Sequence, residues 1–365
     1  MKTIKCLIFL MLILSTSCGR TQKLEFFGET VIVDYPKRMD TLSGHIVVLE
    51  GEYTGLLFAY DGMLVFASDL HPDGWLYLYS AETGKRINAI VQRGNGPDEF
   101  VNPQLWSRFE KDSNEIYIWI NDLPRNNLVL LNTQGERVRE INTSKFKSTN
   151  PYGVGAFHML NDSLLLAHVQ PWRIFENRFT ASGEHVFNYQ LGKTVRTYMF
   201  YSEYESPNNV HGVSPGNYLT SNSTMKPDKT KLATAMFNLK RLNILDIESG
   251  KIKSIATTDA PDLNHLWSGK PVVEHYRGIK SDERYIYVIE STRAKRTEIN
   301  AIYWSEYLSK PSGRIFVFDW GGNFVRILYV EEDVVWITFD PIRRILYSKT
   351  DCEIVRAYDL NFLYK

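Results

Sequence analysis

Short apolar segments alternate with tight polar turns along most of this chain, and a 3.6-residue apolar periodicity is scarce. The apolar segments are rich in Val, Ile and aromatic residues, which favour β-strands. Several segments are apolar at every position, including 75–79, 116–120, 285–289 and 315–318, which indicates sheets that are covered on both faces. The pattern therefore predicts an all-β protein whose sheets stack face to face.

Two kinds of turn recur in alternation. One is a hairpin turn that ends in Gly or Asn, and its copies fall within 76–90, 128–141, 177–189, 242–255, 315–328 and 354–365. The other is rich in Asp, Asn, Ser or Pro, and its copies begin at 61, 112, 161, 227, 281 and 340. The second set is spaced by 49 to 66 residues, which matches the blades of a β-propeller. We therefore predict a six-bladed propeller with four-stranded antiparallel blades. A two-domain β-sandwich is the alternative, but it gives no reason for the recurrence.

The last repeat lacks a clear outer strand, unless residues 362–365 supply it. Two strand-like segments, 29–33 and 45–50, precede the first repeat. We expect one of these N-terminal strands to close the ring by pairing with the last blade. Long loops are expected at 192–217, 258–275 and 292–313, with a short helix at 297–308.

The N-terminus has the features of an export signal. Two lysines precede the apolar run 6–14, which is too short to span a bilayer as a helix. The residues before Cys18 resemble a bacterial lipoprotein signal, with Leu14 four places before the cysteine. We expect a signal peptide at 1–17, lipidation of Cys18 and membrane anchoring through that lipid, with simple secretion as the alternative. A linker at 18–28 and a single propeller at 29–365 complete the predicted organisation.

Charge and cysteine content exclude several classes of protein. The sequence holds 42 basic and 42 acidic residues, and loss of Lys2 and Lys5 with the signal leaves a net charge of −2. A neutral chain disfavours nucleic acid as a partner. After processing, Cys352 is the one cysteine besides Cys18, so an intramolecular disulfide or a cysteine-based metal site is not expected. The eight histidines show no metal-binding spacing, and we expect a monomer without a metal or another cofactor.

One segment is similar to a known family. The run 91–100, VQRGNGPDEF, closely resembles the GxGPGEF segment of TolB-like six-bladed propeller lipoproteins, with Asp98 in place of a Gly. The segments 315–323 and 337–360 look like the closing blades of that family, so the resemblance covers the mature chain. It implies a six-bladed ring, an exported lipoprotein and an unassigned molecular role. The absence of acidic residues at 19–23 favours an outer-membrane lipoprotein that faces the periplasm.

Candidate ligand-binding residues lie in the connections between strands. In the crossover 93–97, two glycines and a proline indicate a structural turn, beside which charged groups could bind a ligand. Aromatic rings and histidines in the long loops could form a binding platform or simple loop packing. The candidates are Arg93, Asp98, Glu99, Trp172, Arg173, His265, Trp267, His275, Tyr303 and Trp304.

No catalytic motif withstands inspection. The GVSPG run at 212–216 fits G-x-S-x-G but lacks the strand-to-helix context that this motif requires. The leading hypothesis is a non-enzymatic recognition scaffold for an envelope protein, a peptide or a glycan. The alternative is an exported hydrolase or lyase that acts on glycans or lactones at the propeller axis, with a metal held by converging Asp, Glu, Asn or His side chains.

Overall fold

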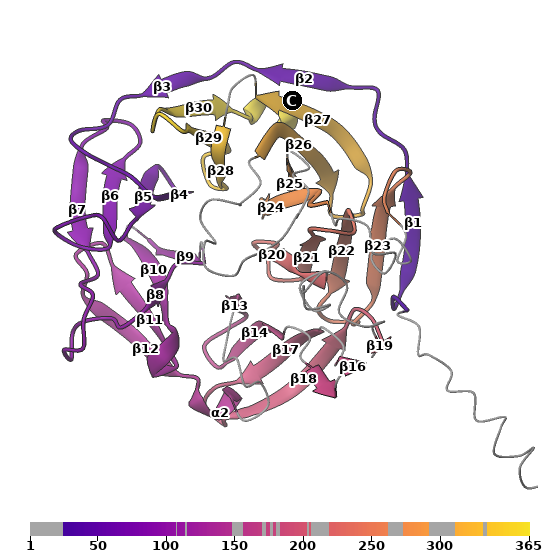
Figure 1. The fold of residues 1–365 in the computed structure, drawn as a ribbon, viewed down its shortest axis with the longest axis horizontal. Coiled ribbons are helices and arrows are strands. Elements are labelled where there is room, and N and C mark those ends of the chain that lie inside the picture. The colour runs from indigo at the N-terminus through magenta and orange to yellow at the C-terminus, as the bar shows by residue number, and fades with distance from the viewer. Residues whose placement is uncertain are drawn as a thin grey trace, which may run out of the picture.

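Six sheets surround a central axis and form a six-bladed β-propeller (Figure 1). The computed structural model describes residues 25–106, 108–113, 115–147, 156–169, 173–175, 178–179, 183–202, 204–205, 219–261, 273–291, 311–330 and 334–365. Within each blade the strands are antiparallel and follow one another outwards from the axis. The predicted fold class is confirmed.

The first three blades each begin at the axis and end at the rim. Blade I contains β4 (Leu56–Tyr60), β5 (Met63–Ala67), β6 (Leu76–Ser80) and β7 (Arg86–Ile90). Blade II contains β8 (Pro103–Gln104) and β9 (Phe109–Asp112), which both pair with β10 (Glu115–Asp122), and then β11 (Asn127–Asn132) and β12 (Arg137–Asn142). Blade III contains β13 (Phe157–Met159), β14 (Leu164–Val169), β17 (Gly183–Asn188) and β18 (Lys193–Met199).

The last three blades are extended or completed by N-terminal strands. Blade IV contains β20 (Ser221–Met225), β21 (Lys231–Met236), β22 (Arg241–Asp246) and β23 (Ile252–Thr257). Blade V contains β24 (Tyr276–Ser281), β25 (Tyr285–Ser291), β26 (Pro311–Asp319) and β27 (Phe324–Val330). Blade VI contains β28 (Val334–Asp340), β29 (Ile345–Thr350) and β30 (Val355–Asp359).

Few other elements occur in the described residues. A small sheet joins β15 (Arg173–Phe175), β16 (Arg178–Phe179) and β19 (Tyr204–Glu205). Three single-turn helices are present, η1 (Leu123–Arg125), α2 (Ser144–Lys147) and η3 (Asn361–Tyr364). No helix in this part of the chain is long and apolar enough to cross a membrane.

The core is divided into six apolar clusters, and each cluster lies between two neighbouring blades. The cluster between blades VI and I contains Tyr347 and Val355 from one blade and Leu57 and Phe66 from the other. Because every blade is buried on both faces by its neighbours, strands in the middle of a blade, such as β5 and β25, are apolar at nearly every position. This arrangement rules out the sandwich alternative.

The N-terminal segment 25–49, which we call the strap, runs around the outside of blades IV, V and VI (Figure 1). Its first two strands, β1 (Glu29–Val33) and β2 (Met39–Leu42), add parallel fifth strands to β23 and β27. Its third strand, β3 (His45–Val47), pairs antiparallel with β30 and becomes the outer strand of blade VI. The predicted closure of the ring by an N-terminal strand is confirmed, and β3 is that strand.

Two details of the predicted repeats are wrong. The third hairpin was expected within 177–189, but its strands are β17 and β18, so the turn falls at 189–192 and part of the expected loop 192–217 is a strand. The sequence of β18 is mostly polar and exposed, so it lacks the apolar pattern by which the other strands were predicted. Residues 361–364 form η3 instead of an outer strand. The helix expected at 297–308 falls outside the described residues.

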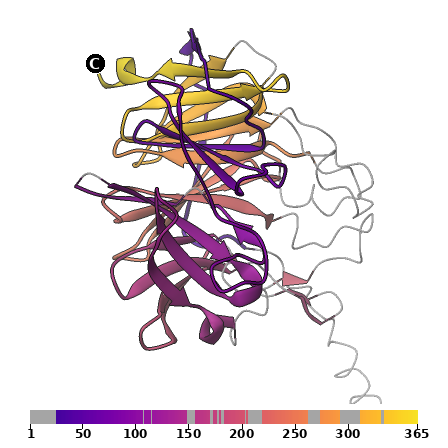
Figure 2. The same ribbon diagram turned by 90° about the vertical axis from the view of Figure 1, so that its left-hand side faces the viewer.

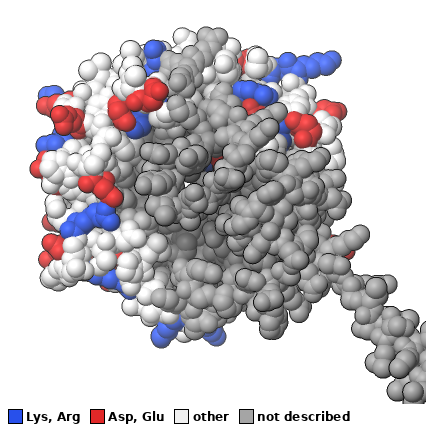
Figure 3. Space-filling view, viewed as in Figure 1, with Lys and Arg blue, Asp and Glu red and all other residues white. Residues whose placement is uncertain are grey.

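The two faces of the disc differ in their connections. The turns between the first and second strands and between the third and fourth strands of a blade are short, and antiparallel pairing places them on one face, the short-turn face. The other connections join strand ends on the opposite face. Figure 2 shows the strands running across the thickness of the disc between these two faces. On the side seen in Figure 3, acidic and basic side chains alternate around the described rim, so no field of one sign dominates there.

Candidate binding site on the propeller axis

Four polar side chains come from the innermost strands of four consecutive blades. Arg108 directly precedes β9, His158 lies in β13, Ser223 in β20 and Lys280 in β24. Figure 1 shows these four strands around the central opening. The four residues therefore lie around the axis, each on a different blade.

The Arg108 guanidinium links three blades. Its Nε donates to the carbonyl oxygen of Phe157 at 2.5 Å. One terminal nitrogen donates to Nε2 of His158 at 2.8 Å and to the carbonyl oxygen of Ser223 at 3.3 Å. Because its planar fork has several donors in fixed directions, one guanidinium can hold blades III and IV against blade II.

His158 forms a second hydrogen bond, with Oγ of Ser223 at 3.0 Å from Nε2. Arginine can only donate, so Nε2 is the acceptor and the neutral ring carries its proton on Nδ1. Burial and the nearby Arg108 charge hold the pKa of His158 well below its ordinary value. His158 is therefore a weak base whose only lone pair at Nε2 is already shared.

Two cations influence one another at this site. Burial and, after it, the Arg108 charge together lower the pKa of Lys280 to about 7. Burial also lowers the pKa of Arg108 to about 10, while the negative charge of Glu184 opposes that shift. Glu184 is fully buried and its Oε1 lies 2.8 Å from Nδ1 of His168. Among the described residues, Glu184 is a carboxylate whose charge acts on Arg108 from a fully buried position.

Blades I and VI supply an apolar side to the axis. The Phe58 and Trp336 rings, from β4 and β28, make an edge contact with centroids 6.2 Å apart. The Trp336 indole donates to the carbonyl oxygen of Leu57 at 2.5 Å, which fixes the ring. The Lys280 ammonium lies 5.9 Å from the Phe58 centroid, within cation–π range. The site combines cationic donors with the half-buried Trp336 ring, whereas Phe58 is 5% exposed and belongs to the core between blades I and II.

The crossover 93–99 has a structural role in the described contacts. The exposed Arg93 side chain pairs with Asp69 of blade I. Glu99 accepts a hydrogen bond from the Gly96 amide at 2.7 Å, and Arg125 of η1 donates to the carbonyl oxygens of Gly96 (2.9 Å) and Glu99. Asp98 is exposed. These contacts hold the crossover against blades I and II, and none of them reaches the axial residues.

The other sequence candidates are only partly described. His275 precedes β24, where its amide donates to the carbonyl oxygen of Phe237 at 2.7 Å. Arg173 lies in β15, and only its backbone is described. The remaining candidates and the GVSPG run lie outside the described residues: Trp172, His265, Trp267, Tyr303, Trp304 and 212–216. Their roles stay predictions.

Sequence reasoning missed the axial residues, although a signal for them exists. Phe58, Arg108, His158 and Ser223 each lie three or four residues before the Asp, Asn or Pro that begins the first turn of their blade. Aligning the repeats on that turn places them at corresponding positions of the innermost strands. A basic side chain at that position, in a strand that is otherwise expected to be apolar, would have pointed to the axial site.

Within the described part of the chain, no three His, Cys, Asp or Glu side chains gather as metal ligands. The same residues that approach the axis are mainly donors and cations, which is the opposite of the oxygen-rich set that a hard divalent cation prefers.

The chain was compared with known families and structures. A model of the TolB-like 6-blade propeller-like family matches residues 57–341. The chain belongs to this family. The match of this TolB-like chain begins in β4 and ends just after β28, so it includes all four axial residues and excludes the strap.

Two solved structures share the TolB-like fold. A Bacteroides fragilis protein described as exported has 13% identity and a TM-score of 0.53, over 90% of this chain and 99% of that one. A member of the DUF4221 family from Bacteroides vulgatus has 12% identity and a TM-score of 0.55, over 93% and 98%. At this identity the likeness establishes the fold alone. Among proteins with curated functions, none matches the chain.

Proposed function

We propose that this protein is an exported, lipid-anchored propeller that works by binding, and that its ligand is an acidic peptide segment of another envelope protein, held at the axis. Export is supported by the lysine-flanked apolar run before Cys18 and by the fold shared with the Bacteroides fragilis protein described as exported. Anchoring at the outer membrane follows from the lipoprotein-like residues around Cys18.

The observation that carries the binding proposal is the pair of half-buried cations Arg108 and Lys280. Two like charges near one another in a partly dry site oppose each other's protonation. A ligand carboxylate placed beside them would favour their charged forms and accept charge-assisted hydrogen bonds. The half-buried Trp336 ring would cover the apolar part of the same peptide.

The Ser223–His158 contact is the one feature that favours the enzymatic alternative, because a hydroxyl beside an imidazole can act as a nucleophile. The position of Arg108 argues against it. A general base needs a free lone pair and a pKa near the working pH, whereas Nε2 of His158 accepts from Arg108 and its pKa is strongly lowered. Binding therefore explains the geometry better than acyl transfer does.

The test compares Lys280→Met with Lys229→Met, which removes the same charge from an exposed turn on the short-turn face. A fluorescent oligoglutamate peptide serves as the probe at low salt, with anisotropy as the readout. Loss of a charged hydrogen-bond partner should weaken binding by roughly tenfold or more in the first variant and leave the second unchanged. Because Lys280 has a pKa of about 7, affinity should also fall as pH rises through that value.

If Lys280→Met and Lys229→Met bound the oligoglutamate peptide with equal affinity, the proposal of binding at the axis would be wrong. Replacing the peptide by an oligouronate tests the glycan alternative with the same two variants. Turnover of an ester or lactone that disappears in Ser223→Ala would instead establish the enzymatic function. Anchoring is tested separately, because Cys18→Ala should release the full chain from the membrane fraction.

A further inference from the structure

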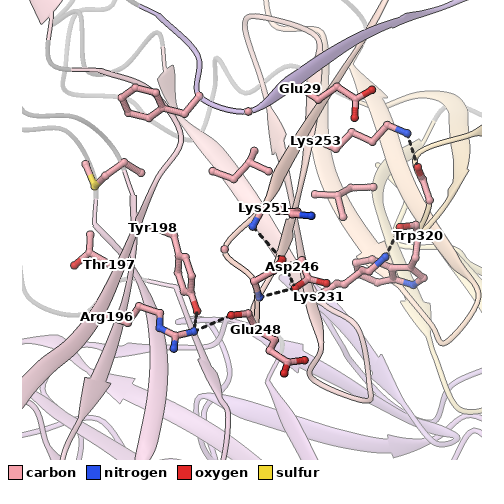
Figure 4. Close-up of a pocket in the computed structure, with 18 residues that line it drawn as sticks. Glu29, Arg196, Thr197, Tyr198, Lys231, Asp246, Glu248, Lys251, Lys253 and Trp320 are labelled. Carbon is pink, nitrogen blue, oxygen red and sulfur yellow. Dashed lines mark hydrogen bonds between the residues drawn. The ribbon is translucent and has the colours of Figure 1, made fainter.

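A concave site lies at the rim, where the strap crosses from blade III to blade IV. It has a volume of about 860 Å³ and is lined by the start of the strap, the outer strand of blade III, the outer half of blade IV and one turn of blade V. We call it the tether groove, and its floor and walls include Phe27, Gly28, Arg196, Lys231, Lys251, Lys253 and Gly321 (Figure 4). None of the axial residues lines it.

Basic side chains in the tether groove are held by main-chain oxygens. Lys231 donates to the carbonyl oxygen of Trp320 at 3.1 Å and Lys253 to that of Gly321 at 2.8 Å. Arg196 donates to the carbonyl oxygens of Ile247 and Glu248 at 3.1 and 3.2 Å (Figure 4). Carbonyl oxygens orient these cations without neutralising their charge, so the groove keeps positive groups in fixed positions.

The carboxylates of the groove offset only part of this charge, and Lys231 is one of the groups that lower the pKa of Asp246. The lining holds four basic side chains and three acidic ones, Glu29, Asp246 and Glu248, in a mature chain whose predicted net charge is negative. Asp246 accepts hydrogen bonds from the amide and hydroxyl of Ser249, which lower its pKa and turn it toward its own loop. Glu29 and Glu248 are exposed at the edge.

Exposed apolar side chains lie in the groove and elsewhere on the strands that form it. Phe27, in the groove wall, is 43% exposed; outside the lining, Ile32 on β1 is 58% exposed and Val195 on β18 is 48% exposed. Basic groups beside exposed apolar side chains are typical of surfaces that meet anionic lipid, where the cations contact phosphate and the apolar groups enter the interface.

The chain itself limits how far this surface can lie from a membrane. The strap is fixed to blade III from Glu25 onwards, since the Ser202 amide donates to the Glu25 carbonyl and the Phe27 amide to the Phe200 carbonyl, both at 2.9 Å. Six residues separate Glu25 from Cys18, and the seven steps along the chain between them span at most about 25 Å when fully extended. A lipid on Cys18 would keep the tether groove close to the headgroups.

We therefore propose that the tether groove binds the phosphate of an anionic lipid headgroup and sets the orientation of the propeller on its membrane. This proposal rests on the anchoring part of the proposed function and not on the axial site. Lys251 and Lys253 meet the phosphate, and Phe27 enters the interface beside it. The blade IV side of the rim then faces the bilayer, and both faces of the disc stay accessible to partners.

The test uses a chain that starts at residue 19 and carries no lipid, because the described residues 25–365 contain all six blades and the closing strand β3. Co-flotation with vesicles measures binding, with mixed phosphatidylglycerol and phosphatidylcholine against phosphatidylcholine alone. We expect binding to the anionic vesicles only. At about 1 kcal/mol per basic group, Lys251→Glu should weaken it about 10- to 30-fold.

A matched control exists in blade I, where the hairpin Glu82-Thr83-Gly84-Lys85 corresponds to Glu248-Ser249-Gly250-Lys251. Lys85→Glu makes the same charge reversal on an equivalent exposed turn and should leave vesicle binding unchanged. Phe27→Ser should weaken vesicle binding without changing the urea midpoint, which supports apolar insertion. Oligoglutamate binding at the axis should be the same in Lys251→Glu as in the unmodified protein, so the two proposals fail independently.

Three results would overturn the proposal. Equal losses in Lys85→Glu and Lys251→Glu would show a diffuse charge effect. Release from vesicles by millimolar inorganic phosphate would assign the groove to a free anion. If Lys251→Glu abolished oligoglutamate binding, the tether groove would be assigned to an acidic peptide.

Discussion

Lys240 donates hydrogen bonds to both carboxylate oxygens of Asp259, at 2.8 and 2.7 Å, with its own side chain fully buried. Lys240 lies in the turn between β21 and β22, and Asp259 follows β23. Tyr35, between the strap strands β1 and β2, donates to the same carboxylate at 2.9 Å and contacts the Lys240 ammonium. A charge-assisted network thus ties the strap to blade IV.

Asp259→Asn should destabilise the protein, because it leaves the buried Lys240 ammonium without its carboxylate. We expect a loss of about 3 kcal/mol in the free energy of unfolding at neutral pH, measured by urea denaturation. Tyr35→Phe removes only one hydroxyl donor and should cost about 1 kcal/mol. Equal effects of the two substitutions would contradict a dominant ion pair.

The pH dependence of the same pair gives a second readout. Burial opposes ionisation of Asp259, but hydrogen bonds from Lys240, Thr257 and Tyr35 outweigh it and hold the pKa of Asp259 well below its ordinary value. The unfolded chain therefore takes up this proton first as pH falls. The contribution of Asp259 to stability is complete above about pH 4 and is lost below it, so the difference between Asp259→Asn and the unmodified protein should shrink in acid.

Val47→Asp should open the ring at its closing strand. Val47 is 7% exposed in the cluster between blades VI and I, whereas the neighbouring Val48 is 80% exposed. A carboxylate at position 47 would be buried without a partner, and we expect it to cost about 3–5 kcal/mol. Val48→Asp makes the same change in the same strap and should stay within about 0.5 kcal/mol. Hydrogen exchange in β30 should rise in the first variant alone.

Gly84→Ala should displace the strap from blade I. Gly84 has φ +69°, and a Cβ there would lie 1.8 Å from the Val48 carbonyl oxygen. Gly51 has a similar φ of +73° with no atom within 4 Å of such a Cβ. Gly51→Ala measures the backbone cost alone, about 1–2 kcal/mol. Gly84→Ala should cost clearly more by urea denaturation, and equal losses would show that the contact with Val48 is unimportant.

The sequence predicted the blades because each turn is encoded locally. Asp, Asn and Gly at the hairpins mark strand ends, and burial between two neighbours makes the strands apolar throughout. Strand β18 was not predicted from this pattern because it lies at the rim, where polar side chains such as Lys193 and Arg196 face solvent. Closure by the strap was predictable as a missing strand, but the parallel pairing of β1 and β2 depends on contacts between segments more than two hundred residues apart.

The axial site was not predicted because its members are distant in sequence and unremarkable one at a time. Arg108, His158 and Ser223 are brought together only when three blades share an axis. The crossover 93–99 attracted attention through its glycines and charges, yet those charges stabilise the turn through Asp69 and Gly96. A local motif reports local structure, whereas a site at a symmetry axis depends on corresponding positions in successive repeats.

His158 should remain neutral under conditions in which an exposed imidazole titrates. Burial and the Arg108 charge both disfavour the imidazolium, so the folded state resists the proton that the unfolded chain accepts below about pH 6.5. Stability should therefore fall as pH drops through that value, with His158 as one contributor. Nitrogen NMR should show a proton on Nδ1 and none on Nε2 of His158. Arg108→Met removes the second cause of the shift and should raise the pKa of His158 toward its ordinary value. Titration of His158 in the ordinary histidine range in the unmodified protein would contradict this assignment and restore His158 as a candidate base.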